Sequence, residues 1–128
     1  MLHEALKQTN LTAEETRALE KALKQVKTKF AKVVTNAVIY GSTIKQSEPV
    51  KRKDLNVLVI MNQKDNDVAR SLEEVLEQVD KKIKLDLKIL SLEEYVAEAH
   101  LESSFYRKVT QEGVEIYKND ELLEPVSS

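Results

Sequence analysis

The chain has 128 residues, of which 41% are hydrophobic and 33% charged, with a net charge of −2. These values suit one folded domain, and the near balance of charges gives no indication of a dedicated nucleic-acid-binding protein. The absence of cysteine excludes disulfides, thiolate metal sites and cysteine nucleophiles. We expect a cytoplasmic protein with no membrane segment and no secretory signal, in which residues 1–118 form a single domain and residues 119–128 a polar, frayed tail.

The first expected helix begins after Thr12. Thr12 and Glu15 have the spacing of a capping box, in which each side chain accepts a hydrogen bond from the backbone N–H of the other residue. Apolar residues then recur at helical spacing as far as residue 30. Residues 33–40 are rich in β-branched side chains and predict a buried strand that ends at Gly41.

The middle of the chain predicts a second strand, a helix and a third strand. Residues 55–61 form an apolar run that only Asn56 interrupts, and such a run is typical of a strand covered on both faces. Asn66 or Asp67 is expected to cap the helix that follows. Residues 83–90 alternate between apolar and polar side chains, and this alternation predicts a strand with one apolar face.

The last third of the chain predicts two helical segments and a closing strand. Ser91 and Glu94 repeat the capping-box spacing, and the helical pattern continues to residue 105 with a break near residues 100–104. Gly113 is typical of a helix C-terminus, and residues 114–117 follow as a short strand. The order of elements predicts an α/β (α+β) fold, in which a small mixed β-sheet packs against helices.

Polar side chains gather where the second strand begins and on one face of the third. Asp54 and Asn56 are two residues apart, so on a strand they project from the same face, and Asp86 lies on the polar face of the third strand. If these strands are neighbours, the three oxygen-bearing side chains can converge on Mg²⁺ or Mn²⁺. Gly41 allows close approach of a ligand, and Ser42 could begin a helix whose N-terminus binds phosphate.

In this order the motifs resemble a minimal nucleotidyltransferase domain of the DNA polymerase beta-like superfamily. That superfamily has a hydrophobic strand, Gly-Ser, about ten residues, then Asp-hydrophobic-Asp/Glu-hydrophobic, with a third Asp on a later strand. The corresponding segments here are VIYGS at 38–42, DLNV at 54–57 and LDL at 85–87. The resemblance extends over residues 33–118 and includes the closing helix and strand.

The resemblance implies metal-dependent transfer of a nucleoside monophosphate from a nucleoside triphosphate to an acceptor. Gly41 and Ser42 would bind the phosphates, Asp54 and Asp86 would be catalytic, and Asp54, Asn56 and Asp86 would bind Mg²⁺ or Mn²⁺. Asn56 stands where the family has a second carboxylate, and the lost charge should weaken metal binding and activity. Small members of the family often pair with a helical protein, so a helical partner is expected, with a homo-oligomer as an alternative.

Two other interpretations remain open. The fold could be kept as a non-catalytic binding module, such as an antitoxin-like partner of a helical toxin. Alternatively, Asp54 and Asn56 could simply satisfy a turn, Asp86 could belong to a solvated strand face, and the basic residues 51–53 could form a solvated loop. Placement of Asp54 and Asp86 on opposite faces of the sheet would favour this last interpretation.

Overall fold

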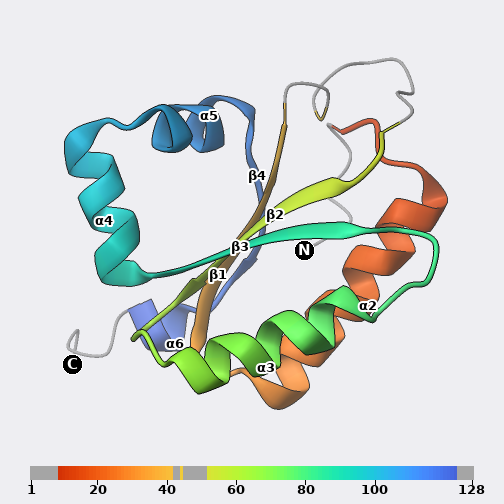
Figure 1. Ribbon diagram of the computed structural model, residues 1–128, viewed down its shortest axis with the longest axis horizontal. Coiled ribbons are helices and arrows are strands. Elements are labelled where there is room, and N and C mark those ends of the chain that lie inside the picture. Colours follow the sequence, from red (N-terminus) through yellow and green to blue (C-terminus); the bar gives the residue numbers. More distant parts are fainter. Residues whose placement is uncertain (1–8, 42–43, 45–51, 124–128) are drawn as a thin grey trace.

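The computed structural model describes residues 9–41, 44 and 52–123, which form a four-stranded sheet with helices on both faces (Figure 1). The mixed α/β class predicted from the sequence is confirmed. The described elements are, in chain order, α2 (Ala13–Lys29), β1 (Val34–Tyr40), β2 (Leu55–Met61), α3 (Asn66–Glu77), β3 (Leu85–Ser91), α4 (Leu92–Leu101), α5 (Ser104–Glu112), β4 (Val114–Lys118) and α6 (Asp120–Leu123).

The strands lie in the order β3-β2-β1-β4. Strand β1 runs antiparallel to both β2 and β4, whereas β2 and β3 are parallel. Parallel neighbours need a crossover connection, and α3 supplies it between β2 and β3. The sheet is therefore mixed, with β2 and β1 at its centre.

Each face of the sheet has its own apolar cluster. Helices α2 and α3 cover one face, and α4 and α5 cover the other (Figure 1). Strand β2 contributes to both clusters, with Val57 and Val59 on the α2–α3 side and Leu58 and Ile60 on the α4–α5 side. Because β2 is covered on both faces, its sequence is an apolar run, as predicted, and Asn56 is its one residue that is not buried.

Side-chain caps fix where the helices begin. Thr12 and Glu15 form the predicted capping box of α2, and Ser91 and Glu94 form that of α4. The predicted cap of α3 at Asn66 or Asp67 is wrong. Asp65 is the N-cap, because its Oδ1 accepts hydrogen bonds from the backbone N–H groups of Asp67 at 3.0 Å and Val68 at 3.2 Å.

The predicted break between the last two long helices lies at Glu102, which has left-handed backbone angles (φ 46°, ψ 46°). Helix α5 then starts at the cap residue Ser103 and ends at Gly113. A Cβ atom on Gly113 would lie 2.2 Å from the carbonyl oxygen of Val109 and 2.8 Å from Cγ1 of Val38. Glycine therefore lets α5 turn directly into β4 while both stay packed on β1.

Residues expected to form a frayed tail include the short helix α6. Asn119 fixes the start of this helix to the rest of the fold. Its backbone N–H donates to the carbonyl oxygen of Thr35 at 2.8 Å, and its Nδ2 donates to that of Ala31 at 2.7 Å. Residues 124–128 of the expected tail lie outside the described part.

Among the residues that the structure describes, every helix is too short or too polar to span a lipid bilayer.

Candidate functional site

Three polar side chains form a row across the sheet. Tyr40 on β1 is in register with Asn56 on β2, and Asn56 is in register with Asp86 on β3. Residues directly paired on adjacent strands project from the same face, and such strands lie about 4.8 Å apart. The side chains of Asn56 and Asp86 are therefore within reach of each other on the face covered by α4 and α5.

Asp54 lies two residues before Asn56, beside the start of this row. The backbone hydrogen bonds between β2 and β3 extend to the residue next to Asp54, because the N–H of Leu55 donates to the carbonyl oxygen of Lys84 at 2.9 Å. Asp54 precedes β2, and extending the strand geometry of about 3.3 Å per residue back to it places its Cα atom on the order of 8 Å from that of Asp86, on the same face. The placement on opposite faces that would have favoured a plain α/β domain is therefore not found.

Asp54 and Asn56 line a pocket of about 200 Å³ at the end of β1 and the start of β2. Tyr40 and Gly41 contribute from β1 and the turn after it, and Lys108 contributes from α5. Asp86 is exposed beside this pocket and does not belong to its wall. The structure thus brings Gly41, Asp54 and Asn56 to one pocket, with Asp86 in the adjacent strand.

Gly41 has the backbone conformation that only glycine adopts easily, with φ +142°. A Cβ atom there would lie 3.6 Å from Nδ2 of Asn56. The bare backbone of Gly41 therefore lies directly beside the Asn56 amide, at the wall of the pocket. Ser42, predicted as the second phosphate-binding residue, lies outside the described residues.

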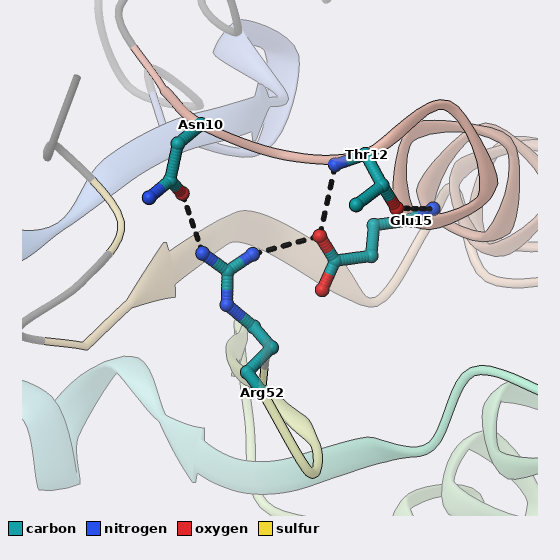
Figure 2. Close-up of polar contacts among 4 residues, drawn as sticks. All are labelled: Asn10, Thr12, Glu15 and Arg52. Carbon is teal, nitrogen blue, oxygen red and sulfur yellow. Dashed lines mark hydrogen bonds and ion pairs between the residues drawn. The ribbon is translucent and has the colours of Figure 1, made fainter. Parts of the chain in front are cut away.

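Arg52 lies on the same pocket wall. Its side chain is largely buried and makes an ion pair that was not predicted from the sequence. Arg52 Nη1 lies 2.7 Å from Glu15 Oε1, and the two side chains are only 9% and 7% exposed (Figure 2). Arg52 Nη2 also donates to Oδ1 of Asn10, and Glu15 Oε1 accepts from the N–H of Thr12 at 2.9 Å. The expectation of a solvated basic loop is wrong for Arg52, which joins the start of α2 to the segment that enters β2.

Two lysines on the pocket wall differ from Arg52 in their ion pairing with the described residues. Lys53 and Lys108 are both exposed, and neither forms an ion pair with any residue in the described part of the chain. Helix α5 holds Lys108 in place, because the next residue, Val109, is 4% exposed and packs against β2. The two lysines therefore line the pocket from two separate parts of the chain, Lys108 from α5 and Lys53 from the segment before β2.

Tyr40 is the half-buried aromatic side chain of the site. Its ring meets that of Phe105 edge to face at 5.7 Å, and Lys88 Nζ lies 5.3 Å from the centre of the Phe105 ring. Burial raises the pKa of Tyr40 above 10.0, and the negative charge of Asp86 raises this pKa further. The influence of Asp86 is consistent with the register, which places Tyr40 and Asp86 in one row with Asn56 between them.

The oxygen-bearing side chains at this site have the chemistry that a hard cation such as Mg²⁺ prefers, but they do not form a pre-built acidic site. No group of three His, Cys, Asp or Glu side chains that could hold a metal ion occurs among residues 9–41, 44 and 52–123. Asp54, Asn56 and Asp86 supply two carboxylates and an amide, which are oxygen ligands of the kind that Mg²⁺ prefers. Mg²⁺ is usually held by one or two carboxylates together with substrate phosphates. The set fits a cation that arrives with a phosphate ligand, not a pre-formed acidic cage.

Sequence reasoning missed Lys108 and the role of Arg52. A signal for Arg52 existed, since Glu15 falls on the apolar stripe of α2 four residues before Leu19, and a buried glutamate needs a cationic or hydrogen-bonding partner.

Comparison with known proteins places the chain in no family, because no protein-family model and no curated protein sequence matches it.

Proposed function

We propose that this chain is a nucleotidyltransferase-like domain that transfers a nucleoside monophosphate from a nucleoside triphosphate to an acceptor with the help of Mg²⁺ or Mn²⁺. One observation carries the proposal: Asn56 is in register with Asp86, and Asp54 stands on the same face beside the turn at Gly41. These are the residues of this chain that match the ordered motifs of the superfamily.

The chain's own residues have distinct parts in this proposal. Gly41 leaves its backbone open beside the pocket, so phosphate oxygens can approach it closely, and Ser42 is proposed to assist there. Asp54 and Asp86 would hold the divalent cation, with the Asn56 amide as a neutral ligand. When bound, the cation would neutralise phosphate charge. Asp86 is exposed, so its carboxylate is also accessible to take the proton of an acceptor hydroxyl.

Calorimetry with ATP and GTP, each with Mg²⁺ and with Mn²⁺, tests the binding part of the proposal. Transfer of an α-phosphate label to protein or nucleic acid in a cell extract tests the chemistry. We expect Asp54→Asn and Asp86→Asn to reduce metal-dependent nucleotide binding and to abolish transfer. Asp67→Asn is the matched control, because Asp67 is exposed on α3 on the other face of the sheet. Absence of binding at millimolar nucleotide, together with absence of transfer, would refute the proposal.

A second candidate function is a non-catalytic binding module, such as an antitoxin-like partner of a helical toxin protein. Asn56 favours it, because the amide leaves the site with one carboxylate fewer than the superfamily pattern. Under this alternative the fold serves to bind a helical protein or a second copy of the chain. Nucleotide binding that appears only in Asn56→Asp would support it, whereas metal-dependent binding by the wild type would favour the enzyme. Either function is proposed for the cytoplasm, where nucleoside triphosphates are available.

A further inference from the structure

We infer that the pocket beside Gly41 binds a polyphosphate chain through Lys53 and Lys108 without requiring a divalent cation. This inference rests on the proposed function in one respect, because it uses the same pocket. It differs in assigning the phosphate contacts to two lysine side chains that the superfamily pattern does not include. The ligand chemistry is a chain of two or more linked phosphates, carried by a nucleotide or present as an inorganic polyphosphate.

The charge on the pocket wall is the first argument. Arg52, Lys53 and Lys108 bring three positive charges, and Asp54 brings one negative charge. The Arg52 charge is already compensated by Glu15 at 2.7 Å, so it cannot attract an anion strongly. Lys53 and Lys108 have no such partner in the part of the chain that the structure describes. The described residues of the wall therefore carry a net positive charge, which favours an anion even when no metal is bound.

The positions of the two lysines are the second argument. Lys53 lies on the segment that enters β2, one residue after the fixed Arg52, and Lys108 lies on α5, one residue before the buried Val109. Each lysine thus follows or precedes an anchored residue, so the Cα positions of both are held by the fold. Two cations from separate elements can contact two different phosphate groups, and a single small anion would use only part of this arrangement.

The size of the pocket is the third argument. Its volume is about 200 Å³, whereas pockets that enclose a whole drug-sized ligand measure about 300–1,000 Å³. A phosphate chain fits such a volume, but a complete nucleotide does not. The base and sugar of a nucleotide would therefore lie outside the pocket, and the affinity should depend mainly on the number of phosphates.

The test is calorimetric titration with sodium tripolyphosphate, ATP and AMP in a buffer that contains EDTA. We expect tripolyphosphate and ATP to bind the wild-type protein and AMP to bind much more weakly. Lys53→Ala and Lys108→Ala should each weaken tripolyphosphate binding about tenfold, the size expected for one charge-assisted hydrogen bond. Both lysines are exposed, so neither variant should unfold, and thermal denaturation checks this expectation.

Arg107→Ala is the matched control. Arg107 is the neighbour of Lys108 on α5, is exposed and carries the same charge, but it does not line the pocket. This variant should bind tripolyphosphate within about twofold of the wild type, because surface charges outside the contact are largely screened. An equal loss in Arg107→Ala and Lys108→Ala would overturn the inference, since it would indicate attraction by overall charge alone.

Failure of this inference can be told apart from failure of the proposed function. Binding of ATP only when Mg²⁺ or Mn²⁺ is present would overturn metal-independent binding and leave the enzymatic proposal standing. Tripolyphosphate binding in EDTA that depends on Lys108, without any label transfer, would support the inference and count against the enzyme. Equal affinities for ATP and tripolyphosphate would identify the phosphate chain itself as the ligand, and stronger binding of ATP would identify the nucleotide. Absence of binding under every condition would overturn both.

Discussion

Arg52 Nη1 and Glu15 Oε1 are 2.7 Å apart and join the first turn of α2 to the segment that enters β2. Both side chains are buried, and Asp54 follows Arg52 by only two residues. The ion pair holds the segment just before the candidate site against the start of α2, two residues from Asp54. The local structure of α2 and the geometry of the site are therefore coupled through one contact.

Loss of this ion pair should destabilise the whole domain. We expect Glu15→Ala to lower the free energy of unfolding by about 3 kcal/mol, because it leaves the Arg52 charge buried without its partner and also removes half of a capping box. Urea denaturation followed by circular dichroism measures the change. Glu20→Ala is the control, since Glu20 is exposed on the same helix and should change stability by less than about 0.5 kcal/mol. Equal effects of the two variants would contradict the structural role of Glu15.

Restoring a carboxylate at position 56 should create a stronger metal site at a cost in stability. Asn56→Asp places a negative charge in register with Asp86, so we expect the free energy of unfolding in EDTA to fall by up to about 1 kcal/mol. Mn²⁺ at a hundred times its dissociation constant should then add about 2.7 kcal/mol. Thermal unfolding with EDTA and with Mn²⁺ measures both effects. Gln63→Glu, which adds the same charge in the turn after β2, should show no stabilisation by Mn²⁺.

Removal of the Asp86 charge should lower the pKa of Tyr40. Asp86→Asn removes the electrostatic contribution and leaves burial, so this pKa should move towards 10.0 but stay above it. Titration of ¹³C-labelled tyrosine by NMR measures the pKa, and Tyr40→Phe assigns the signal. Tyr95 is an internal control, because its pKa is raised by burial and then by the charges of Tyr106 and Glu115, without Asp86. An unchanged Tyr40 pKa would mean that Asp86 does not approach this hydroxyl.

The same pKa shift predicts how stability depends on pH. A phenol whose folded pKa lies above its unfolded value holds its proton more tightly in the folded protein. The contribution of Tyr40 is therefore fully present below about pH 10.0 and is lost as the pH rises from there towards the folded pKa. Asp86→Asn should make this loss smaller, which urea denaturation at pH 9 and at pH 11 can measure.

Substitution of Gly113 should destabilise the junction between α5 and β4. Gly113→Ala puts a Cβ atom 2.2 Å from the backbone oxygen of Val109, so the backbone must shift, and we expect a loss of about 2 kcal/mol or more. Thr110→Ala, at an exposed position of α5, is the control and should change stability by less than about 0.5 kcal/mol. Chemical denaturation compares the two variants, and a neutral Gly113→Ala would contradict the close packing of this turn.

Local patterns in the sequence were sufficient to predict most elements of the fold. The alternation in β3, the apolar run in β2 and the two capping boxes each reflect forces that act within a few residues. Three good capping residues stand in succession, Asp65, Asn66 and Asp67, and the prediction wrongly named the last two. The structure selects Asp65, because its carboxylate reaches two backbone N–H groups, which depends on the angle at which the chain leaves β2.

Sequence reasoning anticipated the closeness of side chains that lie on adjacent strands and of Gly41 in the turn after β1. Asp54, Asn56 and Asp86 could be related because spacing of two residues and strand pairing have simple geometric consequences. Lys108 could not, because a lysine on an exposed helical position is ordinary. Its place at the pocket depends on how α5 folds over β2 after the turn at Glu102. Such a relationship arises from tertiary packing and leaves no periodic pattern in the chain.

The position of β1 has a consequence for synthesis of the protein on the ribosome. Strand β1 is followed along the chain by its partner β2, but among the described strands its other edge pairs with β4, as in the contact between Ala37 and Tyr117. At translation rates of roughly 5–20 residues per second, that edge waits several seconds for its partner. A nascent or prematurely released chain would therefore present an open row of backbone donors and acceptors to other chains. Chaperone binding during this interval would protect the protein from aggregation.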